Sequence, residues 1–65
     1  MEISVVIPAF NEAKVIKDTV VDIKDFLKNN FSNFEIIVID DKSRDRTLEI
    51  IKSIEGIKVI ANLKN

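Results

Sequence analysis

Two short apolar runs limit the folds open to this chain more than any other feature. Residues 3–7 read Ile-Ser-Val-Val-Ile, and residues 35–39 read Glu-Ile-Ile-Val-Ile. Both are rich in β-branched side chains, and the second is continuously apolar after Glu35, which is typical of a strand buried in a parallel sheet. Pro8 cannot donate to a sheet ladder and ends the first run. We predict strands over residues 3–8 and 35–39, and a weaker third strand over residues 57–61.

The two segments between these predicted strands show the periodicity of helices. In the first gap, apolar residues recur at spacings of four, three and four, which makes one stripe of an amphipathic helix: Ile16, Val20, Ile23 and Leu27. Asn11 is the predicted N-cap of this helix, and residues 28–30 end it. In the second gap, Ser43 or Asp45 can cap a helix that Gly56 stops. Its inward side chains are Leu48, Ile51 and Ile54.

The predicted fold class is α/β, a β-α-β-α-β chain with a three-stranded parallel sheet in the order 3-2-1. Strands that alternate with single helices run parallel, and their crossovers are right-handed. Both helices then cover one face of the sheet and leave the other face bare. The cover for that face is the remainder of a longer chain or a second copy, and we hypothesise that the isolated chain forms a homo-oligomer through it.

Composition removes several classes of function. The 65 residues include no Cys and no His, which excludes disulfides, thiolate metal sites and imidazole bases. A net charge of −1 lacks the basic excess of nucleic-acid binders, so no nucleic-acid partner is expected. No apolar run approaches the roughly 20 residues of a membrane segment. The absence of Cys fits a reducing compartment, and a cytoplasmic location is expected.

Chemically useful side chains follow the first two strands. Ligands of open parallel sheets bind at the carboxyl ends of the strands, where the loops converge. Residues 8–12 offer an aromatic ring and a carboxylate, and residues 40–43 offer two adjacent acids. An aromatic face can stack on a base, and a carboxylate can accept from the imide N–H of uracil or from N1–H of guanine.

The same two segments carry a specific resemblance. Residues 4–12, Ser-Val-Val-Ile-Pro-Ala-Phe-Asn-Glu, and residues 34–41, Phe-Glu-Ile-Ile-Val-Ile-Asp-Asp, resemble the opening of family 2 glycosyltransferases, and Ser43, Asp45 and Thr47 continue the pattern. The closest likeness is to dolichyl-phosphate mannose synthase-like enzymes. The resemblance implies the nucleotide-binding half of a GT-A, Rossmann-like fold and a UDP or GDP sugar donor. It also implies a divalent cation (Mg²⁺ or Mn²⁺) in the full-length enzyme and a polyprenyl phosphate acceptor at the cytoplasmic face of a membrane.

Carried over residue by residue, the resemblance implies a nucleotide pocket formed by Pro8, Phe10, Glu12, Ile39 and Asp41. It gives supporting roles to Asn11, Asp40 and Ser43, with Asp40 shaping the loop. Two departures from the family pattern stand out. Phe10 replaces a common Tyr, which keeps stacking but removes a hydroxyl. A basic loop with Lys42, Arg44 and Arg46 replaces one richer in Gly and Thr, and it either meets diphosphate or is simply solvated.

The resemblance also implies parts that these residues do not supply. A metal-binding Asp-x-Asp and a catalytic base come further along in such enzymes, so residues 1–65 are expected to be a partial nucleotide-sugar-binding domain. We assign no catalytic residue and no metal ligand, and we expect the fragment alone to bind no metal and to be inactive.

Two other interpretations stay open. An acidic pair at a strand end, such as Asp40 and Asp41, also occurs in receiver-like phosphoacceptor domains and in phosphatases with a nucleophilic Asp. A receiver, however, gives residues 8–12 no role. The chain can alternatively be a stand-alone, non-catalytic interaction module that self-associates through its bare sheet face.

Overall fold

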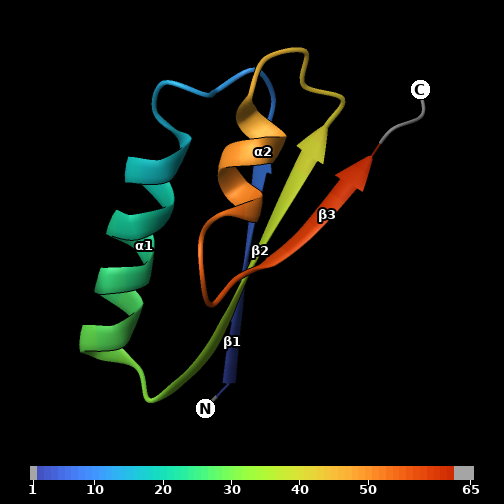
Figure 1. Cartoon of the computed structure of the whole chain (residues 1–65). Helices are drawn as coiled ribbons and strands as arrows, with labels where there is room; N and C mark the ends of the chain where they lie inside the picture. The colour runs from blue at the N-terminus through green and yellow to red at the C-terminus, as the bar shows by residue number, and fades with distance from the viewer. Residues whose placement is uncertain (1, 63–65) are drawn as a thin grey trace.

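The computed structural model describes residues 2–62, which form two β-α units followed by a third strand (Figure 1). The elements are β1 (Glu2–Ala9), α1 (Ile16–Asn30), β2 (Asn33–Asp41), α2 (Thr47–Lys52) and β3 (Lys58–Asn62). This order agrees with the prediction. Strands β1 and β2 are both longer than predicted at each end, and β1 continues one residue past Pro8, which was predicted to end it. Asn62, which follows the predicted third strand, belongs to β3, and residues 63–65 lie outside the described part of the chain.

The three strands form one parallel sheet in the order β1-β2-β3, which is the predicted arrangement. Strand β2 is central, and its Ile39 is level with Pro8 of β1 and with Ile60 of β3. All three strands point their carboxyl ends toward the same edge, where the loops that follow β1 and β2 lie (Figure 1). The predicted α/β fold is therefore confirmed.

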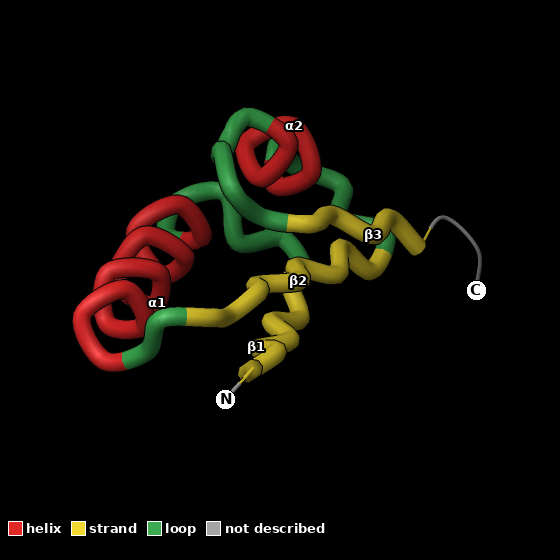
Figure 2. The backbone as a smooth tube through the Cα atoms, turned by 90° about the horizontal axis from the view of Figure 1, so that it is seen from below, coloured by secondary structure: helices red, strands yellow, loops and turns green. Residues whose placement is uncertain are grey.

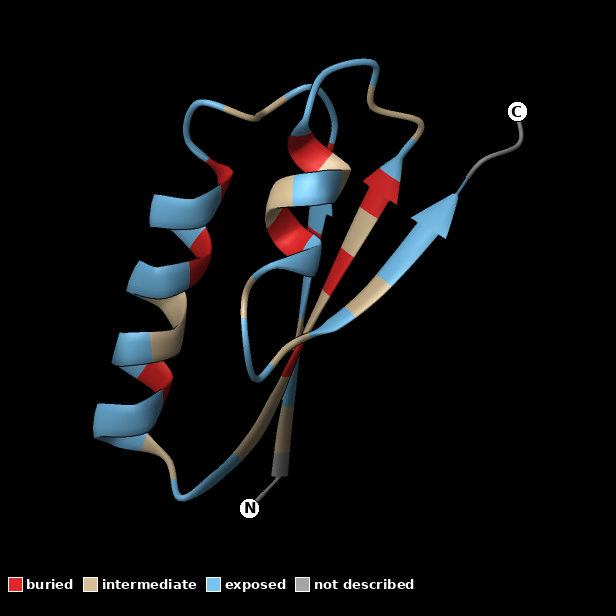
Figure 3. Cartoon of the chain, viewed as in Figure 1, coloured by how far each residue is buried: buried red, intermediate tan, exposed pale blue. Residues whose placement is uncertain are grey.

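Both helices lie on one face of the sheet, and the core is the layer between them and the strands (Figure 2). Its buried apolar side chains are Ile7, Ala9, Ile16, Val20, Leu27, Ile36, Val38 and Ile51. Alternate residues of β2 enter this layer, because successive side chains of a strand point to opposite faces (Figure 3). The predicted stripe of α1 is confirmed, with Ile23 half-buried beside its three buried members.

The opposite face of the sheet carries neither of the helices that the structure describes. Its apolar side chains, which we call the open face, are Val6, Pro8, Ile37, Ile39 and Ile60. Val6 and Ile60 are 55% and 50% exposed. Glu35 borders this face near the amino ends of the strands, where it accepts a hydrogen bond from Ser4 (2.6 Å) and pairs with Lys58 (2.9 Å).

Helix α1 begins later than predicted, so the assignment of Asn11 as its N-cap was wrong. The N-cap position is Val15, whose side chain makes no cap hydrogen bond. A turn precedes the helix, in which the carbonyl of Glu12 accepts from the amides of Val15 (3.0 Å) and Ile16 (2.8 Å). Asn11 has a φ of 50° and bonds to another loop. A local pattern could not show this, because the partner lies far along the chain.

Helix α2 is short, and a residue that precedes it accepts a hydrogen bond from its first amide. Its N-cap position is Arg46, so the prediction that Ser43 or Asp45 caps this helix was wrong. Asp45 lies one residue before the N-cap, and its carboxylate accepts a hydrogen bond from the amide of Thr47 at 2.9 Å. Gly56 lies beyond the helix end, with a φ of 80°, and turns the chain toward β3 instead of stopping the helix directly. Neither helix within residues 2–62 is long and apolar enough to cross a membrane.

Candidate functional site

An open hollow of about 280 Å³ lies at the carboxyl ends of β1 and β2. Its lining residues are Pro8, Ala9, Phe10, Glu12 and Asp41. Four of the five predicted pocket residues therefore meet there. The fifth, Ile39, is the register partner of Pro8 and belongs to the open face beside the hollow.

The side chains that line the hollow differ in their exposure and in the groups that they offer to a ligand. The ring of Phe10 is 56% exposed and offers a face for stacking. Glu12 is half-buried, and Asp41 is exposed at the end of β2. One oxygen of the Asp41 carboxylate accepts a hydrogen bond from the side-chain amide of Asn62 at 3.2 Å. Sequence reasoning missed Asn62, because its place beside Asp41 depends on the register of β3 against β2.

The loop after β1 is tied to the loop after β2 through Asn11. Its amide donates to the Ser43 hydroxyl at 2.9 Å, and its side-chain carbonyl accepts from the amide of Arg44 at 2.7 Å. Asn tolerates the left-handed backbone better than most residues, which suits this position. Asn11 and Ser43 therefore support the hollow by joining its two loops.

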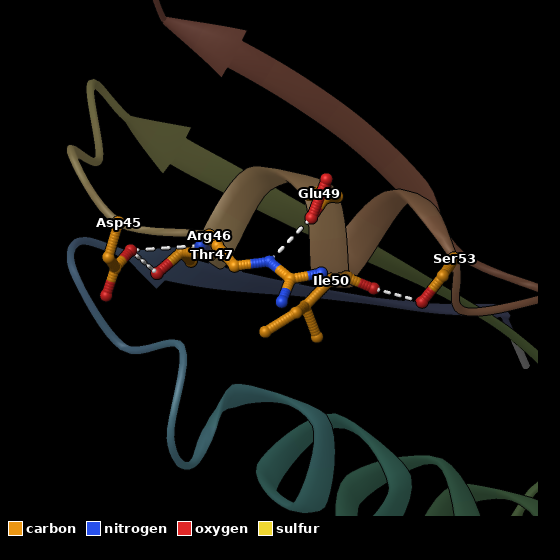
Figure 4. A network of polar contacts seen from close by, with 6 residues as sticks. All are labelled: Asp45, Arg46, Thr47, Glu49, Ile50 and Ser53. Atoms are coloured by element: carbon orange, nitrogen blue, oxygen red, sulfur yellow. Dashed lines mark hydrogen bonds and ion pairs between the residues drawn. The ribbon is translucent and has the colours of Figure 1, made fainter.

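A second set of hydrogen bonds joins the loop after β1 to Asp45 and to Thr47, the first residue of α2. The amide of Glu12 donates to the Thr47 hydroxyl at 2.7 Å, and the amide of Ala13 donates to the Asp45 carboxylate at 3.2 Å. Asp45 also accepts from the amide and the hydroxyl of Thr47 (Figure 4). The hydrogen bond from the Thr47 hydroxyl lowers the pKa of Asp45 below its usual range. Thr47 itself is completely buried.

These ties determine what the loop after β1 can offer a ligand. Backbone N–H groups at the start of the first helix often bind phosphate in nucleotide-binding sheets. Here the amides of Asn11, Glu12 and Ala13 all donate to side chains of the neighbouring loop. These three amides are thus already bonded, and the groups that line the hollow include an aromatic ring and two carboxylates.

Asp40 lies on the helix side of the sheet, away from the side chain of Asp41. It is only 1% exposed, and its Oδ2 accepts from the amide of Ser43 at 3.3 Å. This contact agrees with the predicted role in shaping the loop. Its Oδ1 has no hydrogen-bond partner among residues 2–62.

Comparison with known families decides what kind of protein carries this arrangement. The model of glycosyl transferase family 2 matches residues 4–65. The chain belongs to glycosyl transferase family 2. The match covers both strand-end segments and the fold around the hollow, so it confirms the resemblance seen in the sequence.

Curated relatives of this family 2 chain include three archaeal proteins. A dolichol-phosphate mannosyltransferase of Pyrococcus furiosus is 36% identical over 67 residues, covering 98% of the chain and 18% of the relative. A UDP-N-acetylglucosamine–dolichyl-phosphate N-acetylglucosaminyltransferase of Methanococcus voltae is 42% identical over 53 residues, covering 82% and 19%. An uncharacterized protein of Methanocaldococcus jannaschii is 45% identical over 64 residues, covering 98% and 24%. The chain thus spans about a fifth of the length of these relatives, and no solved structure matches it.

Family 2 membership raises the question of a divalent cation. Such ions bind oxygen ligands, above all grouped carboxylates. Residues 2–62 contain no group of three acidic side chains that could hold a metal ion. The carboxylates of Asp40 and Asp41, although adjacent in sequence, point to opposite faces of β2. This part of the family 2 chain therefore does not fit a metal centre.

In this family 2 chain, a basic loop follows β2 where the family pattern is richer in Gly and Thr. Lys42 has a φ of 57°, a left-handed conformation that Gly adopts without strain. Arg46 pairs with Glu49 at 2.7 Å on the exposed side of α2 (Figure 4). This pair keeps the Arg46 guanidinium on the helix surface, which agrees with the solvated interpretation for that residue.

Proposed function

We propose that this chain is the nucleotide-recognising portion of a glycosyltransferase that transfers a sugar from a nucleoside diphosphate sugar to an acceptor. The observation that carries the proposal is the hollow in which Phe10, Glu12 and Asp41 meet. The Phe10 ring stacks on the base, and the carboxylates accept from a base N–H or a ribose hydroxyl. Ligands of open parallel sheets bind at this edge.

The donor in this proposal is a UDP or GDP sugar, and the acceptor is a polyprenyl phosphate. The relatives from Pyrococcus furiosus and Methanococcus voltae support this choice, because their names include dolichol phosphate or dolichyl phosphate. A lipid-linked acceptor places the reaction at a membrane surface, and we assign the enzyme to the cytoplasmic face.

The transfer step needs a base near the acceptor hydroxyl and positive charge on the leaving diphosphate. We assign neither role to residues 2–62. The Mg²⁺ or Mn²⁺ belongs in this proposal to the full-length enzyme. The 65-residue chain alone is expected to bind nucleotide without transferring sugar.

A titration of UDP and of GDP, with and without Mn²⁺, followed by amide NMR shifts tests the proposal. Binding with a Kd on the order of millimolar, equal with and without Mn²⁺, is expected because only the nucleoside side is contacted. Shifts should centre on residues 8–12 and Asp41. The Asp41→Asn variant should lose them, and the control Asp22→Asn, an exposed acid of α1, should keep them. Absence of shifts at millimolar nucleotide, or tight Mn²⁺-dependent binding, would contradict the assignment.

A second candidate function is self-association of the isolated chain through the open face. Val6 and Ile60 are half exposed there, and of the acids at its borders Glu35 is paired with Lys58. Asp41 accepts a hydrogen bond from the side-chain amide of Asn62. In a solution of the chain alone, the open face of a second copy is the apolar surface that can cover it.

Sedimentation equilibrium tests the self-association. The Val6→Lys variant should shift the chain to monomer, because it places a charge within the apolar contact. The control Phe26→Lys changes a 60% exposed ring on α1 and should leave the association unchanged. A wild-type chain that stays monomeric at high concentration would rule out this function.

A further inference from the structure

The loop that carries Phe10 and Glu12 is held by side chains that do not line the hollow. Three successive amides, those of Asn11, Glu12 and Ala13, donate to side chains at 2.9, 2.7 and 3.2 Å. The acceptors all lie in the segment between β2 and the first turn of α2. The backbone of the binding loop is therefore set by the neighbouring loop.

Thr47 bonds to both sides of this arrangement, to Glu12 and to Asp45. Its hydroxyl accepts from the amide of Glu12 and donates to Asp45, so it acts as acceptor and as donor at the same time. Because Thr47 is fully buried, removing the hydroxyl would leave the amide of Glu12 without an acceptor in an enclosed place. A methyl group of the same shape could not replace it.

Asp45 completes the tie with both carboxylate oxygens. Its Oδ1 accepts from the amide and hydroxyl of Thr47, and its Oδ2 accepts from the amide of Ala13. One oxygen thus orients the hydroxyl that holds Glu12, while the other holds the next residue along. An asparagine has a single oxygen and cannot accept at both positions.

We propose that Asp45 and Thr47 are positioning residues for nucleotide recognition, which fix the backbone of residues 11–13 so that Phe10 and Glu12 meet the ligand in a preset geometry. This inference rests on the proposed function of the hollow. Neither residue contacts the nucleotide: Thr47 is buried behind the loop, and Asp45 lies outside the hollow lining. Their contribution is preorganisation, which raises affinity by lowering the ordering that binding requires.

The test measures UDP and GDP affinity by NMR for wild type, Thr47→Val, Thr47→Ser and Asp45→Asn, together with hydrogen exchange of the Glu12 and Ala13 amides without ligand. Thr47→Val and Asp45→Asn should weaken binding about 5- to 10-fold, the effect of one lost hydrogen bond. Thr47→Ser keeps the hydroxyl and should bind within about twofold of wild type. Exchange at Glu12 should rise in Thr47→Val, and exchange at Ala13 should rise in Asp45→Asn.

Glu35→Gln is the matched control, because Glu35 also accepts from a hydroxyl but lies toward the opposite end of β2. It should leave affinity unchanged. Far-UV circular dichroism confirms that each variant is folded at the temperature of the titration, and the exposed Asp45 position keeps the test available if Thr47→Val unfolds.

Unchanged affinity and unchanged amide exchange in both variants would overturn the positioning role while leaving the proposed function in place. A wild-type chain that binds neither nucleotide would overturn the proposed function and the affinity part of this inference. The two failures are distinguishable because the exchange measurement needs no ligand.

Discussion

The turn before β3 allows a quantitative test of the fold through Gly56. Its φ is 80°, and a side chain in the left-handed region costs about 1–2 kcal/mol. A Cβ added there would lie 2.9 Å from Nζ of Lys24 and 3.3 Å from its Cε. That ammonium donates to the carbonyl of Glu55 at 2.7 Å, a bond worth about 0.5–1.5 kcal/mol. The Gly56→Ala variant should therefore lose about 2–3 kcal/mol of unfolding free energy.

This loss is large for a chain of 65 residues, whose total stability is about 3–10 kcal/mol. Urea unfolding followed by far-UV circular dichroism measures it, because the chain has no Trp or Tyr for fluorescence. Repeating Gly56→Ala in a Lys24→Met background isolates the contact, since only the backbone cost of about 1–2 kcal/mol remains there. An equal cost in both backgrounds would refute the contribution of Lys24, and a cost under about 0.5 kcal/mol would refute the backbone argument.

Two further predictions concern charged groups. The hydrogen bond from Ser4 and the pairing with Lys58 hold the pKa of Glu35 below its usual range, so its stabilising effect is present above about pH 4.5 and is lost as pH falls through the lowered pKa. Glu35→Gln should be less stable than wild type at pH 7 and equal to it near pH 2 in urea titrations, whereas a constant difference would contradict this account. Asp40→Asn removes a buried charge whose Oδ1 lacks a partner within residues 2–62, and should raise the unfolding free energy by about 1–3 kcal/mol. A measured decrease would show that the Asp40 charge stabilises the loop.

The architecture could be predicted because each element has a strong local signal. The apolar runs at residues 3–7 and 35–39 indicate strands, and the stripe from Ile16 to Leu27 indicates one amphipathic helix. Parallel pairing and the handedness of crossovers then leave few topologies. The same topology places residues 8–12 near Asp41, and four of the five pocket residues that the resemblance implied line the hollow, whereas Ile39 does not.

The starts of the helices and the ties between the loops could not be predicted in this way. Asn11 has the residue type of an N-cap, but its side chain finds the amide of Arg44, and the helix begins only at Ile16. Thr47 reads as an ordinary first-turn residue, yet its hydroxyl is the acceptor for Glu12. Such hydrogen bonds depend on how close the two loops lie in space. The local sequence preferences of either loop do not indicate that distance.

The ties between the loops also limit how this region can be exchanged between proteins. Three neighbouring amides, those of residues 11–13, must each meet a matching acceptor at Ser43, Thr47 or Asp45. Deleting one residue from either loop would shift every donor past its acceptor at once. A chimera that takes only one of the two loops from a relative of different loop length should therefore fail, whereas transplanting both loops together should preserve the hollow.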